Sequence, residues 1–131
     1  MMNRRALTLR AFSSWNTGQF TYGSKDCCQF AAHVAEVITG HNYVAQFAYA
    51  SKAEADQLIT PHGSLDGLVR TVLGEPSADL QDGDPVLVDM PIMGQAMGVK
   101  LGKNAVALYD ARMIQIAPRY WNHGWSLCRQ S

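Results

Sequence analysis

The sequence has few cysteines, no excess of charge of either sign and no long apolar run, and each shortage excludes a class of protein. Its three cysteines, Cys27, Cys28 and Cys128, show no C-x-x-C spacing, so neither a disulfide framework nor a cysteine zinc site is expected. The 11 basic and 11 acidic side chains balance and indicate no nucleic-acid partner. No apolar stretch approaches the roughly 18 residues of a membrane span. We therefore expect no metal, no other cofactor and no membrane span.

The N-terminal stretch MMNRRALTLRAF lacks both the apolar core and the small-residue cleavage site of a secretory signal. Together with the few cysteines, this predicts a protein made in a reducing cytoplasm without a signal peptide. The chain of 131 residues is long enough to bury one core. Residues 1–131 are therefore predicted to form a single domain.

The clearest helix signal covers residues 27–39. Asp26 is a typical N-cap, Gln29 completes a capping-box pattern, and Gly40 is a typical C′ stop. Apolar residues recur at helical spacing and predict one buried stripe, formed by Cys27, Phe30, Ala31, Val34 and Ile38. The opposite face, which is expected to meet solvent, carries Gln29, His33 and Glu36.

Three further helix signals and one run of strands complete the pattern. Helices are predicted at residues 3–14, from Ser51 as cap through about Ile59, and at 65–73 with Ser64 as cap and Gly74 as stop. Short β-like runs then follow at close spacing, at residues 86–89, 96–101, 105–109, 113–116 and 125–128. Helices followed by an antiparallel meander of about five strands predict an α+β domain.

Cys27 is the candidate nucleophile, because the partial positive charge of a helix N-terminus favours a thiolate. The alternative is a small buried hydrophobic residue. Cys28 projects about 100° away around the helix and is interpreted as packing. Asp84 is expected to close the turn at Gly83 rather than to contact a substrate. Three methionines, Met90, Met93 and Met97, are interpreted as an adaptable surface in a loop.

A cysteine peptidase needs an imidazole within hydrogen-bond reach of the sulfur. His33 is excluded, since it lies about 120° around the helix from Cys27 and roughly 9 Å along the axis. His41 lies past the far end of the same helix. His62, in a predicted turn, and His123, before the last predicted strand, remain as substitute bases, although loop histidines are usually solvated.

The residues around Cys27 form an ordered motif, which consists of Phe20 to Gly23, then Asp26 and Cys27, then Phe30. It resembles the Y-x-x-G…D-C-S-G-[FL] signature of the NlpC-like cell-wall peptidases, papain-superfamily cysteine enzymes that cut peptidoglycan stem peptides. Downstream, residues 83–88 and 96–102 resemble the G-D-[LV]-[VL]-F-F and H-V-G-I-Y-L-G strands of that family. A group of short phage- and prophage-encoded members also shares a terminal W-x-[LV], here Trp125 to Leu127.

The resemblance implies an NlpC-like fold, in which the cysteine helix packs on the C-terminal sheet. It also implies a degenerate catalytic site. Ala96 occupies the position of the general-base histidine, and Phe20 matches the tyrosine that helps to bind the oxyanion.

Two functions follow as hypotheses. The first is a phage tail-associated or tail-assembly protein, a pseudoenzyme that is incorporated into the virion tail and contacts other virion proteins. A catalytically dead module that still binds peptidoglycan peptides is an intermediate form of this hypothesis. The second is an active cysteine peptidase or amidase that cuts peptidoglycan stem peptides during phage entry. It would use Cys27 as nucleophile, helix N-terminal amides as oxyanion donors, and a relocated base.

Overall fold

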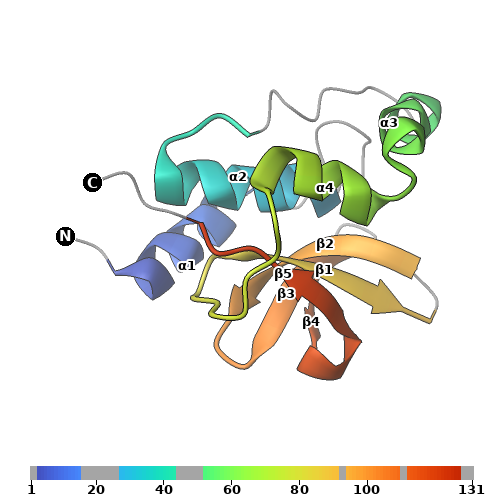
Figure 1. Cartoon of the computed structure of the whole chain (residues 1–131). Coiled ribbons are helices and arrows are strands. Elements are labelled where there is room, and N and C mark those ends of the chain that lie inside the picture. The colour runs from blue at the N-terminus through green and yellow to red at the C-terminus, as the bar shows by residue number, and fades with distance from the viewer. Residues whose placement is uncertain (1–2, 16–26, 44–51, 92–93, 110–111, 128–131) are drawn as a thin grey trace.

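Helices precede strands along the chain, which confirms the α+β class (Figure 1). The computed structural model describes residues 3–15, 27–43, 52–91, 94–109 and 112–127. The helices are α1 (Arg4–Ser14), α2 (Cys27–Thr39), α3 (Lys52–Ile59) and α4 (Leu65–Leu73), with short 3₁₀ turns η2 (Thr60–His62) and η3 (Pro118–Tyr120). The strands are β1 (Pro85–Met90), β2 (Gly94–Leu101), β3 (Asn104–Tyr109), β4 (Arg112–Ile116) and β5 (Trp121–Gly124).

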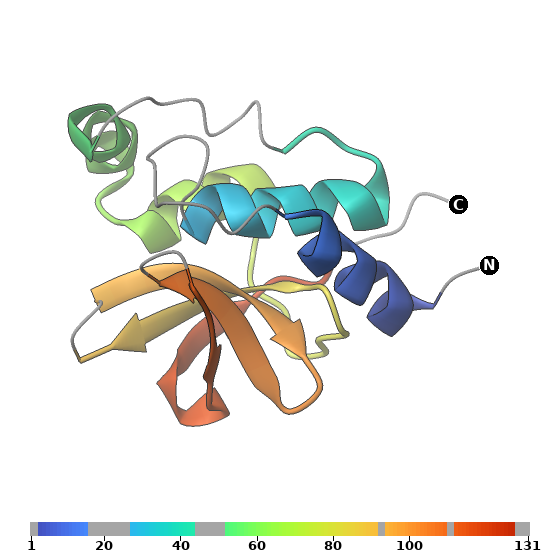
Figure 2. The ribbon, with the colours of Figure 1, turned by 180° about the vertical axis from the view of Figure 1, so that it is seen from behind.

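The five strands form one antiparallel sheet in the order β4-β3-β2-β1-β5. Figures 1 and 2 show α2 and α4 side by side over one face of this curled sheet, with α1 flanking α2. Helix α3 lies at the opposite end of the molecule from α1. The predicted packing of the cysteine helix on the C-terminal sheet is therefore confirmed.

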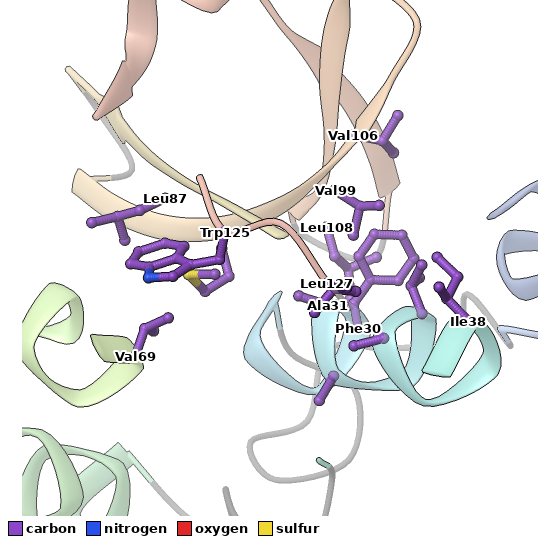
Figure 3. Packing of buried hydrophobic residues seen from close by; sticks show 14 of the residues in the cluster. Phe30, Ala31, Ile38, Val69, Leu87, Val99, Val106, Leu108, Trp125 and Leu127 are labelled. Carbon is purple, nitrogen blue, oxygen red and sulfur yellow. The ribbon is translucent and has the colours of Figure 1, made fainter. Parts of the chain in front are cut away.

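Alternation along the strands divides the apolar side chains between two clusters. Leu87 and Met97 are paired across β1 and β2 and belong to the main core between the sheet and the helices. Val88 and Ala96 are the next pair and belong to a second cluster. Figure 3 shows the main core, in which Phe30 of α2 approaches the strands. Phe30 and Leu87 are both fully buried, and such burial contributes about 1.5–3 kcal/mol for each side chain.

The helix ends follow the local signals in the sequence. Asn3 Oδ1 accepts a hydrogen bond from the Ala6 amide at 2.8 Å and caps α1. Ser64 Oγ accepts one from the Gly67 amide at 3.1 Å and caps α4 as predicted. Gly40 follows α2 with a φ of +79°, which confirms the predicted left-handed stop. The predicted caps Asp26 and Ser51 lie outside the described residues.

The last strand differs from the prediction. It spans Trp121–Gly124 rather than residues 125–128, and Cys128 lies outside the described residues. The partner strand β1 begins at Pro85, which has no N–H to continue the ladder. The Trp125 amide still donates to the Pro85 carbonyl at 3.0 Å, but Pro85 cannot return a bond. The Leu127 amide donates to Asp84 Oδ1 at 3.0 Å instead of to a strand.

Two predicted exposures are also wrong. Gln29 is buried, with 2% of its surface exposed, because α1 covers this side of α2. Ser14 Oγ lies 2.9 Å from His33 Nε2, and the Trp15 ring packs on His33 one turn after Gln29. Met97 is not in a loop but in β2, where it is buried in the main core, and Met90 is the last residue of β1. Met93 lies outside the described residues.

Candidate functional site

Cys27 is the first residue of α2 and its side chain is half-buried. It packs against the second apolar cluster of the sheet. Cys28, the next residue, packs instead against the main core. The two neighbouring thiols therefore lie in different surroundings, as the helical rotation between adjacent residues requires. The remaining residues of the predicted motif before α2, Phe20 and Asp26, lie outside the described residues.

Ala96 lies in β2 and belongs to the same cluster that Cys27 packs against. It is buried, with 4% of its surface exposed. The cluster is apolar throughout and comprises Val86, Val88, Ala96, Ala105, Ala107 and Ile116. The fold thus brings together the helix position and the strand position that the sequence singled out. Beside the thiol it supplies methyl groups of this cluster, which can neither accept nor donate a proton.

Two histidines lie on or after α2, at a distance from its first turn. His33 lies on the side covered by α1, where Nε2 is 2.9 Å from Ser14 Oγ. His41 follows Gly40 at the C-terminal end of α2, and its ring centroid lies 4.5 Å from that of Tyr43. A helix of 13 residues is about 20 Å long, so His41 is far from Cys27. These positions agree with the expectation that neither His33 nor His41 can act as the base for Cys27.

The two proposed substitute bases, His62 and His123, both contact α4. His62 lies in η2, and its Nδ1 is 3.2 Å from Thr71 Oγ1. His123 lies in β5, where Nε2 is 3.2 Å from Arg70 Nη2 and 3.6 Å from Asp66 Oδ2. Within the described residues, the hydrogen-bonding and ion-pair partners of both imidazoles are α4 side chains.

Asp84 closes the turn before β1, in the role expected from the sequence, but it also joins distant parts of the chain. Its carboxylate is fully buried and accepts hydrogen bonds from the Gln81 amide at 2.7 Å and the Leu127 amide at 3.0 Å. Arg4 of α1 completes the arrangement through an ion pair with the same carboxylate. No local pattern reveals this pairing, since the two charged residues are 80 positions apart.

Beside the cysteines, α2 and α4 border an apolar hollow above the sheet. It contains about 340 Å³ of atom-free space, part of it open to solvent. Its walls include Cys28, Ala32, Ala35, Val69, Leu73 and Met97. Cys28, Ala32 and Ala35 line it together, which agrees with the interpretation of Cys28 as a packing residue. This hollow can hold an apolar group, and the titratable residues in its lining are Cys28 and Tyr43.

The part of the chain that the structure describes shows neither a cluster of metal-ligating side chains nor a membrane-spanning helix. No group of three or more histidine, cysteine, aspartate or glutamate side chains is arranged there to hold a metal ion. No helix among the described ranges has the length and apolar character needed to cross a bilayer.

The comparisons with known proteins identify the family. The profile of a domain of unknown function, DUF6950, matches residues 3–127, and thus nearly the whole α+β domain. No curated protein matches the sequence. Since the match covers almost every described element, from α1 through β5 and the segment after it, the chain belongs to the DUF6950 family.

Proposed function

We propose that this protein is a phage tail-associated or tail-assembly protein with an NlpC-like, papain-superfamily fold and lost catalysis. One observation carries the proposal. Cys27, at the start of α2, packs on the sheet cluster that contains Ala96. In the peptidases that the sequence resembles, the position of Ala96 holds the general-base histidine. An alanine methyl there cannot take the proton of the thiol.

The positions of the histidines support the loss of catalysis. A general base must come within about 2.6–3.2 Å of the group that it deprotonates. His33 faces α1, His41 lies at the far end of α2, and His62 and His123 contact α4. A working site would need a base from another part of the chain or from a partner.

A structural role would depend on the scaffold and not on the thiol. The buried Arg4–Asp84 pair and the Leu127 amide tie α1, β1 and the C-terminal segment together. In this proposal the domain is made in the bacterial cytoplasm, joins the virion tail, and contacts other virion proteins through its surface. Retained binding of peptidoglycan peptides is compatible with the same fold.

A second candidate, an active peptidase or amidase acting on peptidoglycan stem peptides, is favoured by the exposure of Cys27. Its thiol is half-buried rather than enclosed, at the N-terminus of a 13-residue helix. The helix dipole there favours a thiolate, and the amides of the first turn would serve as oxyanion donors. This candidate differs from the first in one requirement, which is an imidazole coupled to the sulfur.

The pH dependence of Cys27 alkylation, followed by mass spectrometry, separates the two candidates. Cys28 and Cys128 in the same sample serve as internal controls. For a pseudoenzyme we expect the rate to rise through a single titration step, as for an isolated thiol. A rate that rises through two steps, the lower of which disappears in His62→Gln or His123→Gln, would establish a coupled base and contradict the proposal.

A genetic test addresses the tail role directly. In a phage or prophage that carries this gene, Cys27→Ala should leave plaque formation unchanged. The fold-disrupting Asp84→Ala should reduce the yield of complete particles. Intact particles that fail to infect with Cys27→Ala would support the peptidase. Normal particles with Asp84→Ala, in the absence of detectable folded protein, would rule out an assembly role.

A further inference from the structure

His123 lies at the seam between β5 and α4, where it faces both a donor and an acceptor. Its Nε2 is 3.2 Å from Arg70 Nη2 and 3.6 Å from Asp66 Oδ2. Arg70 is shared among several partners. Its Nε donates to Asp66 Oδ1 at 3.0 Å, and its Nη1 donates to Glu75 Oε2 at 3.1 Å. The imidazole is 37% exposed, so protons reach it from solvent.

The register of β5 places this imidazole on the helix side of the sheet, next to an irregularity in the ladder. Leu87 of β1 pairs with His123, but the next residue, Val88, pairs with Trp121, so β5 carries an extra residue at this point. Such bulges commonly redirect a side chain out of the regular ladder. On the β1 side the neighbour of the imidazole is the apolar Leu87. The charged groups that face it are Asp66 and Arg70 of α4, and Arg70 is in turn paired with Glu75 just after that helix.

The chemistry of the two partners makes the contact dependent on protonation. A guanidinium only donates hydrogen bonds, so Nε2 must be the unprotonated nitrogen when it accepts from Arg70. Protonation places a hydrogen on Nε2, which then faces a second donor. The nearest acceptor is Asp66 Oδ2, the oxygen of this carboxylate that Arg70 Nε does not use.

We propose that His123 is a protonation-sensitive switch between α4 and β5. The neutral imidazole accepts from Arg70, and the protonated imidazole donates to Asp66. Arg70 keeps its bonds to Asp66 Oδ1 and Glu75 in both states. Asp66, Glu75 and Arg70 together carry one net negative charge, and the added proton neutralises it. Acidification thus replaces the hydrogen bond between Arg70 and a neutral imidazole with an ion pair between the imidazolium of β5 and Asp66 of α4.

His62 provides a matched control within the same protein. It also contacts α4, but through the Thr71 hydroxyl at 3.2 Å. A hydroxyl can either donate or accept, so protonation of His62 requires no exchange of partners. Both histidines therefore contact α4, but His62 meets a hydroxyl and His123 meets a guanidinium and a carboxylate.

Nuclear magnetic resonance of the full chain tests the switch. The ¹⁵N signals of the Arg70 guanidinium should shift with the same midpoint as the ring signals of His123. This response should be lost in His123→Gln and retained in His62→Gln, with unchanged backbone amide spectra away from each site. Arg70 signals that stay constant through the titration of His123, or that still respond in His123→Gln, would overturn the proposal.

Crystal structures of the unmodified protein on either side of that midpoint give a second readout, which does not depend on a variant that folds. At the lower pH the separation of His123 Nε2 and Asp66 Oδ2 should shrink from 3.6 Å to hydrogen-bond length, about 3 Å, as the imidazole moves away from Arg70 Nη2. The same separation in both crystals would contradict the switch.

Discussion

Removal of the Asp84 carboxylate is the sharpest test of how this fold is held together. The side chain is fully buried, and its oxygens accept hydrogen bonds from the Gln81 and Leu127 amides and pair with Arg4. Arg4 itself is 12% exposed and also donates through Nε to the Asp82 carbonyl at 2.9 Å. In Asp84→Ala, a nearly buried guanidinium loses its counter-charge and two backbone donors lose their acceptors.

The expected cost follows from those losses. Breaking a buried ion pair by removing one partner costs about 3–5 kcal/mol, because the other charge stays buried. Each orphaned backbone donor that water cannot reach adds to this, on the order of 1 kcal/mol or more. A domain of this size has an unfolding free energy of about 5–15 kcal/mol, so Asp84→Ala would remove a large fraction of it.

Urea denaturation followed by tryptophan fluorescence measures this loss. With a slope of about 2 kcal/mol per molar urea, the midpoint should fall by roughly 1.5–2.5 M. Asp89→Ala is the matched control, since Asp89 lies in the same strand with an exposed side chain and should change stability by no more than about 0.5 kcal/mol. A loss below about 1 kcal/mol for Asp84→Ala would refute the reasoning from burial and pairing.

Two other substitutions probe how the scaffold packs. Gly83→Ala should destabilise more than Gly63→Ala, by at least about 1 kcal/mol in urea denaturation. Both glycines have positive φ, but a Cβ at Gly83 would lie 2.0 Å from a side-chain carbon of α2, whereas Gly63 has open space. Trp125→Phe should lower the unfolding free energy by about 1–3 kcal/mol, since the buried indole loses its hydrogen bond to the Gly74 carbonyl. Trp121→Phe, at a half-buried ring, should cost less, and the reverse order would contradict this account.

Much of the fold is readable from local patterns. The α2 boundaries follow from the apolar spacing and from Gly40, and the start of α4 follows from Ser64. These signals are reliable because a cap or a left-handed glycine acts on backbone groups within a few residues. Four of the five strands are also found at their predicted places, since each alternates between two apolar clusters. The position of Cys27 at a helix N-terminus is predicted in the same way, because the signals that set the start of α2 lie next to it in the sequence.

The errors arise where a distant part of the chain decides the outcome. Gln29 reads as a surface residue on one helix, yet α1 covers that side of α2. The last strand ends at Gly124 because Pro85 of its neighbour has no N–H to donate, and the Leu127 amide bonds to the Asp84 side chain instead. The substitute-base hypothesis for His62 and His123 stays a prediction, and the tertiary structure places both imidazoles in contact with α4.

The sequence by itself determined the helix and strand order, the α+β class and the position of Cys27 at a helix N-terminus. It did so because periodicity, caps and turns are set by neighbours along the chain. Only the tertiary structure placed Cys27 against the cluster of Ala96, paired Arg4 with Asp84, and set His123 between Asp66 and Arg70. These contacts join residues far apart in sequence, so their geometry exists only once helices and sheet have packed.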